Sequence, residues 1–104
     1  MHQQTQSHLY QLQEILQDLT LWESLPPNEQ ALQSTEPFAI DTLAPEQWLQ
    51  WIFIPRMHAL IDRGSSLPTQ IAVSAYIEEA MKELDGLARL LAPLIEIEKL
   101  LQNQ

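Results

Sequence analysis

Apolar residues recur at steps of three and four positions in the first quarter of the chain, which is the spacing of one face of a helix. The repeat consists of Leu9, Leu12, Leu16, Leu19 and Trp22. Ile15 widens this stripe, and the opposite positions are mostly glutamine. The pattern predicts an amphipathic helix over residues 4–22. Its leucine stripe can face a core within the chain or a second copy of the chain, so monomer and dimer both stay open.

The segment EQWLQWIFIPRMHAL, residues 46–60, is the most apolar stretch and predicts a second helix. Pro45 suits its first turn, where backbone N–H groups have no partner within the helix, and Thr42 or a neighbour is the expected cap. We expect the helix to stop at Gly64. Wrapped at about 100° per residue, its apolar side chains cover most of the circumference, which is typical of a central, buried helix.

Pro55 lies in the middle of this apolar run. It has no backbone N–H, so in an α-helix it leaves the carbonyl of Trp51 without its usual donor. The simplest expectation is a kink that lets the helix wrap around its neighbours. The alternative is that the kink opens a pocket.

Two further periodic stretches predict helices over residues 75–84 and 87–101. Ser74 is the expected N-cap of the first. Pro93 lies inside the second and is expected to kink or split it. Residues 23–45 form a long connection, and its prolines prevent one continuous helix. Its apolar side chains expected to anchor it on the core are Leu32, Phe38 and Ile40.

These elements predict an all-α fold, since the chain has two glycines and no alternating strand pattern. With 104 residues, of which 45% are apolar and 18% charged, it suits one globular domain over residues 1–104. The connections favour a small antiparallel four-helix bundle with a long loop between the first two helices. The absence of cysteine excludes disulfides, thiolate catalysis and zinc sites with sulfur ligands.

Fourteen acidic residues face five basic ones, for a net charge of −9 at pH 7, and the first basic residue is Arg56. An acidic surface repels phosphate backbones and anionic membranes, so we expect no direct binding to nucleic acid or membrane. A basic protein partner is compatible with this charge, which also serves solubility by itself. No basic, apolar leader and no apolar run of bilayer length is visible, so we expect a cytoplasmic protein.

PFAIDTLAPEQWLQWIFIPRMHALID, residues 37–62, resembles the signature segment of the YqcC-like family, small proteins found chiefly in gammaproteobacteria. AYIEEAM at residues 75–81 and LLAPLIEIEKLL at residues 90–101 follow in the same order and spacing, so the resemblance covers nearly the whole chain. It implies a small helical bundle and supplies no activity, cofactor or functional residue to carry over. Members are often encoded beside a tRNA pseudouridine synthase, which is an association of genes.

Metal and catalytic motifs are not found in the sequence. A di-iron bundle needs Glu-x-x-His on two helices, which this chain does not contain. A phosphate-cradling glycine loop and a nucleophile elbow are also missing. We therefore predict no cofactor and no metal. An enzyme that pairs two carboxylates, such as Asp41 and Glu78, is the weakest alternative.

The candidate binding residues combine charge and aromatic surface. Arg56 is expected to form an ion pair with Asp41, Glu78 or Glu79. His58 is either a pH-sensitive or ligand-binding group or a satisfied structural residue. Aromatic side chains anchor interfaces when they are half exposed and otherwise belong to the core. The full set is Asp41, Trp48, Trp51, Arg56, His58 and Tyr76.

The sequence thus predicts a non-catalytic accessory module that binds a protein partner. The alternative is a small-molecule-binding bundle with a pocket near the Pro55 kink, lined by Trp48, Trp51, Arg56 and His58. A pocket of roughly a few hundred Å3 favours the ligand, and a continuous exposed apolar patch favours the partner.

Overall fold

The computed structural model describes residues 2–103 and shows helices without strands in that range. The α-helices are α1 (His2–Asp18), α2 (Glu29–Leu32), α3 (Pro45–Trp48), α4 (Ile54–Asp62), α5 (Val73–Ala80) and α6 (Leu87–Gln102). The 3-10 turn η1 (Pro37–Ala39) and the π-helical turn η2 (Leu49–Phe53) complete the set. The all-α expectation is confirmed. None of the described helices combines the length and the apolarity needed to cross a bilayer.

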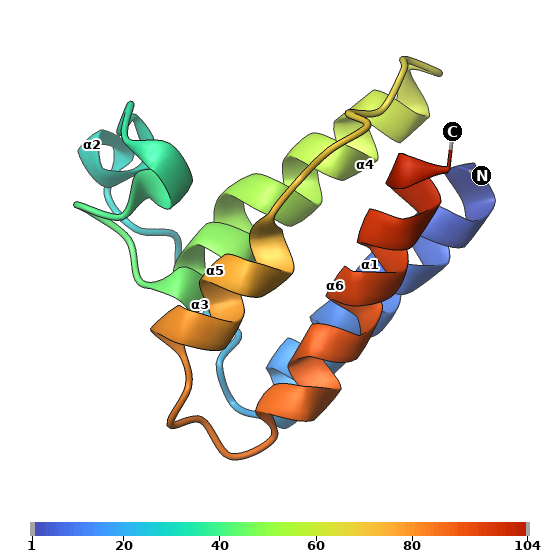
Figure 1. Cartoon of the computed structure of the whole chain (residues 1–104). Coiled ribbons are helices and arrows are strands. Elements are labelled where there is room, and N and C mark those ends of the chain that lie inside the picture. The colour runs from blue at the N-terminus through green and yellow to red at the C-terminus, as the bar shows by residue number, and fades with distance from the viewer. Residues whose placement is uncertain (1, 104) are drawn as a thin grey trace.

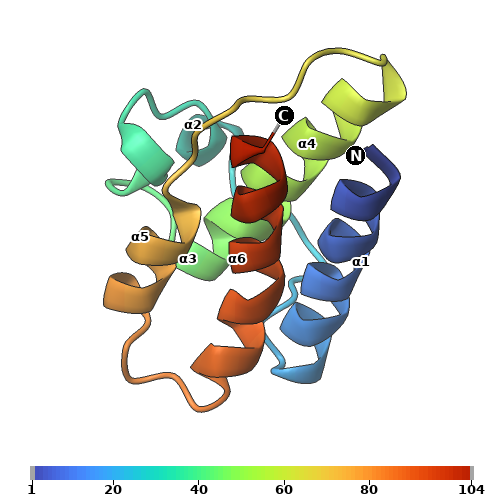
Figure 2. The same cartoon turned by 45° about the vertical axis from the view of Figure 1, so that its right-hand side comes forward.

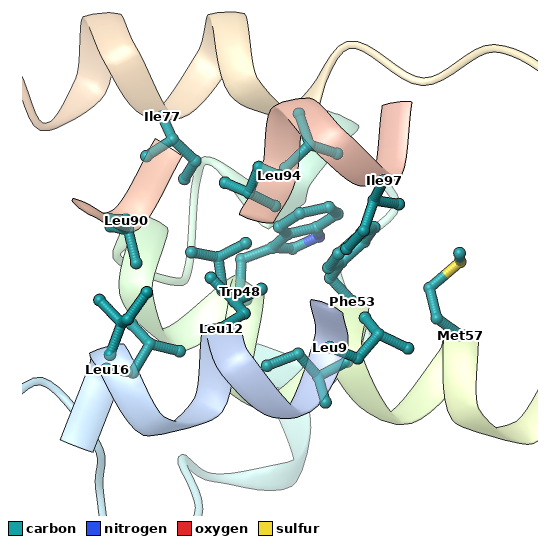
Figure 3. Close-up of a cluster of buried hydrophobic side chains, with 14 of the residues drawn as sticks. Leu9, Leu12, Leu16, Trp48, Phe53, Met57, Ile77, Leu90, Leu94 and Ile97 are labelled. Carbon is teal, nitrogen blue, oxygen red and sulfur yellow. The ribbon is translucent and has the colours of Figure 1, made fainter. Parts of the chain in front are cut away.

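α1 and α6 pack against each other in opposite directions, so that α1 begins and α6 ends at the same end of the molecule (Figure 1, Figure 2). The stripe of α1 faces the core, because Leu9, Leu12 and Leu16 are fully buried. Figure 3 shows these side chains together with those of α6 and the middle of the chain. Each such burial contributes roughly 1.5–3 kcal/mol. The fully buried residues of α6 include Leu90, Leu94, Ile97 and Leu101.

α1 ends at Asp18, four residues before the expected end at residue 22. Thr20 adopts the left-handed conformation, with φ of 60°. Its N–H donates to the carbonyl of Gln17 at 3.1 Å, and the N–H of Leu21 donates to that of Leu16 at 2.9 Å. These two bonds form a Schellman motif, which closes a helix. The expected boundary was wrong because a threonine, rather than a glycine, occupies the left-handed position.

Residues 45–62 form one helical stretch, the central helix, which α3, η2 and α4 make in succession. Pro55 does not end it. The N–H of Ile54 donates to the carbonyl of Leu49, five residues back, so a π turn widens the helix directly before the proline. The helix stops before Gly64, whose φ of 65° is left-handed, as expected. The expectation of burial almost all round is wrong for α4, where Pro55, Arg56 and Ala59 are exposed.

α5 begins at Val73 and ends at Ala80, so the expected range of 75–84 is wrong at both ends. Ser74 does not cap the helix but lies in its first turn. Its N–H and its hydroxyl both donate to the carboxylate of Glu98, at 2.8 and 2.6 Å. A carboxylate from α6 therefore satisfies the start of α5, which sequence proximity does not reveal. α6 itself runs unsplit through the buried Pro93.

The long connection contains α2 and η1, which lie at the side of the molecule away from α1 in both views (Figure 1, Figure 2). Asn28 caps α2, accepting the N–H of Ala31 at 2.8 Å. The expectation that Ile40 anchors this connection is wrong, since its side chain is 63% exposed and the buried neighbour is Ala39. Thr42 does not cap the central helix either, and its hydroxyl donates to the carbonyl of Ala31.

Candidate functional site

An apolar groove lies between the central helix and the segment that leads into α5. Its volume is about 280 Å3. Arg56 is the one charged residue among those that line it. The groove is lined by Phe38, Trp48, Phe53, Arg56, Met57, Leu60, Pro68, Ile71, Ala72 and Val73.

Four aromatic rings form one wall beside this groove. Phe38 stacks on Tyr76, with ring centroids 4.1 Å apart and an interplanar angle of 6°. Phe38 also makes a T-shaped contact with Trp48, with ring centroids 5.0 Å apart, and Trp48 in turn stacks on Phe53 at 5.5 Å. Such ring pairs contribute about 0.5–1.5 kcal/mol beyond the burial of their area. The aromatic wall, Phe38, Trp48, Phe53 and Tyr76, thus joins η1, the central helix and α5.

The backbone under this wall is strained. Phe38 has φ of 58° and Ala39 has φ of 48°, and neither is a glycine. A residue with a β-carbon in this region costs on the order of 1–3 kcal/mol, and such strain concentrates at functional sites. The N–H of Ala39 donates to the carbonyl of Glu36 at 2.9 Å, which helps to hold the turn. The turn directs the Phe38 ring onto Tyr76 and Trp48.

Arg56 is exposed at the edge of the groove and makes no ion pair with the described carboxylates. Two of the expected partners make other contacts. Asp41 accepts the hydroxyl of Ser34 at 2.5 Å, and Glu79 pairs with Lys82 at 3.4 Å. The expectation of an internal ion pair for Arg56 is therefore wrong, and its guanidinium is available to a ligand or a partner.

Tyr76 is half-buried at the end of the aromatic wall. Burial raises the pKa of its hydroxyl, and the nearby charge of Glu46 raises it further. A tyrosine hydroxyl is neutral at physiological pH even without this shift, so it can act as a hydrogen-bond donor there.

Trp51 lies outside the groove, in a polar cluster with Glu23. Its indole N–H donates to the Glu23 carboxylate at 3.0 Å, and the amide of Gln47 donates there as well. The buried amide of Gln50 accepts the N–H of Glu23 at 2.8 Å and donates to its carbonyl at 2.7 Å. The cluster fastens the segment after α1 to η2. The sequence analysis did not identify Glu23 or Gln50 as interacting residues. The one sequence signal for this cluster is Gln50, a polar residue inside an apolar run.

His58 is half-buried and also lies outside the groove. Its ring centroid lies 5.0 Å from that of Tyr10 on α1, with an interplanar angle of 40°. Of the candidate residues, the structure brings Trp48 and Arg56 together in the groove, and Tyr76 joins them through the aromatic wall. It places Asp41, Trp51 and His58 elsewhere.

Within the described residues, neither a hollow on α1 nor the metal-binding types of side chain form a second site. A hollow of about 510 Å3 is lined by side chains of α1 alone, so it is the outer surface of one helix. Within residues 2–103, no group of three or more His, Cys, Asp or Glu side chains is placed to hold a metal ion. The groove can therefore bind apolar groups and, through Arg56, an anionic group.

Comparison with known proteins gives several matches over almost the full length. The DUF446 family model, described as tRNA pseudouridine synthase C, matches residues 4–100. An uncharacterised protein of Haemophilus influenzae is 55% identical over 103 residues, which cover 99% of this chain and 97% of that protein. The uncharacterised protein YqcC of Escherichia coli is 39% identical over 99 residues, covering 95% of this chain and 89% of that one. Its solution NMR structure matches with a TM-score of 0.85 at 36% identity, covering 96% of this chain and 86% of that chain.

One relative differs in length from these. A tRNA pseudouridine synthase C of Pectobacterium carotovorum is 48% identical over 65 residues. The match covers 62% of this chain but 17% of the synthase. Most of that protein therefore has no counterpart in the chain described here, and its name does not transfer an activity.

Proposed function

Because the chain belongs to the YqcC-like family, DUF446, we propose that it is a non-catalytic accessory module that binds a tRNA pseudouridine synthase in trans. One observation carries this proposal: a segment 48% identical to this chain occurs within a longer protein named tRNA pseudouridine synthase C. Fusion holds two modules at high effective concentration and makes even a weak contact persistent. Where the modules are separate chains, the same contact has to form by association.

In this proposal the chemistry belongs to the synthase. The apolar groove has one charged side chain, and no acid–base pair lines it. Acid–base catalysis would require groups within hydrogen-bond reach of the reacting atoms. An apolar lining of this kind is suited to binding rather than to acid–base catalysis.

The charge of the chain supports a protein partner of this kind. An enzyme that binds tRNA needs lysine and arginine at its surface. A chain with a net charge of −9 is attracted to such a surface, and complementary charge raises the rate of association. It also avoids the tRNA itself, so no direct contact with nucleic acid or membrane is part of the proposal.

The remaining assignments belong to the same proposal. We propose that residues 1–104 act as one domain and that the protein works in the cytoplasm. We keep the antiparallel four-helix bundle with its long loop as the description of its architecture. One or two copies of the chain can take part.

Small-molecule binding is the second candidate function. The groove of about 280 Å3 supports it, since ligand pockets begin at roughly that size. The groove lies at Trp48 and Arg56, two of the four residues expected to line a pocket at the Pro55 kink.

Co-purification tests the proposed function. The chain and the tRNA pseudouridine synthase C of the same organism are expressed together, and the synthase carries the affinity tag. The chain is expected to elute with the tagged synthase. A larger amount should be recovered at about 50 mM salt than at about 200 mM, because salt screens the attraction between the acidic chain and a basic synthase. A second pseudouridine synthase of that organism, equally tagged, is the control. Recovery that is equal with both synthases, or absent with both, contradicts the proposal.

A further inference from the structure

We propose that the apolar groove is the anchor site for one segment of the synthase, which inserts two adjacent apolar side chains and places a carboxylate on Arg56. This inference rests on the proposed function and names the surface through which it works. Three features support it: the volume and lining of the groove, the charge of Arg56 at its edge, and the strained backbone of Phe38 and Ala39 beside it.

The volume and lining of the groove match an interface anchor. An apolar cavity of about 150 Å3 accepts one benzene ring, so about 280 Å3 accepts two side chains of that size. Trp48, Phe53 and Met57 are buried and form its floor. Aromatic residues, methionine and arginine are the types enriched where protein interfaces concentrate their binding energy.

The groove fits a protein segment better than a small molecule. Small-molecule sites enclose most of their ligand and direct several polar groups at it. This groove opens onto the surface, and Arg56 is the one charged side chain that lines it. Such an arrangement suits side chains that project from a larger body, because that body covers the open side.

The charge of Arg56 determines the chemistry of the segment. Of the five basic residues, Lys82, Arg89 and Lys99 pair with carboxylates of the chain. Arg56 makes no such pair among the described residues, although the chain has 14 acidic residues. A guanidinium binds a carboxylate with two parallel hydrogen bonds, which a lysine cannot reproduce. The net negative charge of the chain attracts a basic protein at long range. At the groove itself, Arg56 favours an acidic residue of that protein.

The wall of the groove is formed before any partner arrives. Phe38 and Ala39 both have positive φ, and the ring contacts of Phe38 hold that conformation. Preorganised walls reduce the entropy that binding has to overcome. Backbone strain at the edge of an apolar groove is expected when the shape of the groove is needed for binding.

Two substitutions test the groove with little risk to the fold. Ala72 is exposed and lines the groove, so Ala72→Trp fills it without removing a core contact. Ala88→Trp places the same side chain on an exposed position of α6 outside the groove. Arg56→Glu reverses the rim charge. Arg63→Glu is its match, because Arg63 is also exposed and makes no ion pair among the described residues.

The affinity of each variant for the purified synthase is measured by titration calorimetry, and circular dichroism and thermal melting verify that each is folded. Ala72→Trp and Arg56→Glu are expected to weaken binding at least about tenfold, a loss of about 1.4 kcal/mol. Ala88→Trp and Arg63→Glu are expected to stay within about twofold of the wild type. A photoreactive residue at the exposed Gln70 is expected to cross-link a synthase segment with two apolar residues beside an Asp or Glu.

The outcomes separate the two proposals. If the wild type binds the synthase and the two groove variants bind equally well, the groove is not the anchor, while the proposed function stands. If the wild type forms no complex, both are overturned. Native mass spectrometry adds a third outcome: a small molecule that the wild type retains and Ala72→Trp lacks, with synthase affinity unchanged, assigns the groove to a ligand and overturns the inference.

Discussion

Glu98 on α6 accepts two hydrogen bonds from Ser74, one from its backbone N–H at 2.8 Å and one from its hydroxyl at 2.6 Å. A carboxylate at this place satisfies donors that a helix start leaves without partners, and it complements the positive end of the helix dipole. The contact fixes where α5 begins. Since Ile71, Ala72 and Val73 immediately precede Ser74 and line the groove, it also fixes one side of the groove.

Replacing Glu98 with alanine is therefore expected to lower the free energy of unfolding by roughly 2 kcal/mol, because two hydrogen bonds to a charged group are lost. Glu98→Gln should lose less, since the amide keeps one acceptor. Urea denaturation measures both. Glu96→Ala is the control, because its ion pair with Lys99 at 3.7 Å is exposed and contributes little. Equal losses in Glu98→Ala and Glu96→Ala would show that the contact with Ser74 is not stabilising.

Gln50→Leu is expected to destabilise the protein by about 1–3 kcal/mol despite placing an apolar side chain in the core. The buried amide of Gln50 satisfies both the N–H and the carbonyl of Glu23, and leucine can do neither. Gln17→Leu, at an exposed position of α1, is expected to change stability by less than about 0.5 kcal/mol. A Gln50→Leu variant as stable as the wild type would mean that water replaces the lost partners.

The ends of α1 and α4 predict opposite effects of glycine. Thr20 and Gly64 occupy equivalent left-handed positions, with φ of 60° and 65°. Thr20→Gly removes the steric cost of a β-carbon, partly offset by glycine entropy, and is expected to raise stability by about 0.5 kcal/mol. Gly64→Ala meets no atom within 4 Å, so its expected loss of about 1 kcal/mol is conformational alone. Melting temperatures should move in opposite directions, and a shared direction contradicts this interpretation of the two caps.

Tyr76 predicts a dependence of stability on alkaline pH. Burial, followed by the charge of Glu46, raises its pKa in the folded state. The unfolded chain then loses the phenolic proton first, so its contribution to stability is complete below about pH 10 and falls as pH rises through the folded pKa. Tyr76→Phe is expected to reduce that fall in denaturant titrations between about pH 9 and pH 11. Tyr10→Phe, at an exposed tyrosine, is the control, and an identical pH profile for wild type and Tyr76→Phe is the contrary result.

Hydrophobic periodicity was sufficient to predict the all-α fold and the extents of the central helix and α6. It did not predict the ends of α1 and α5, because these depend on a threonine in a left-handed conformation and on a carboxylate 24 residues away in the sequence. Where a kink at Pro55 was expected, the helix has a π turn directly before the proline, in which the N–H of Ile54 donates to the carbonyl of Leu49.

For the candidate site, residue type predicted Trp48 and Arg56 but not their neighbours. The ion pair expected for Arg56 requires acidic side chains that fold into other contacts, and a sequence rich in carboxylates does not distinguish which of them come near. The positive φ of Phe38 has no local signal, because no glycine marks it. Trp51 resembles Trp48 in the sequence, yet its indole donates to Glu23 and it does not line the groove.

The mass of the particle formed by the purified chain and the purified synthase tests the central claim most directly. Light scattering on a size-exclusion column measures it at about 50 µM of each protein, where complexes with a Kd below that value are populated. We predict a single peak whose mass is the sum of the synthase and the 12.0 kDa chain, or a multiple of that sum. Two separate peaks, each with the mass of one free protein, would contradict the account.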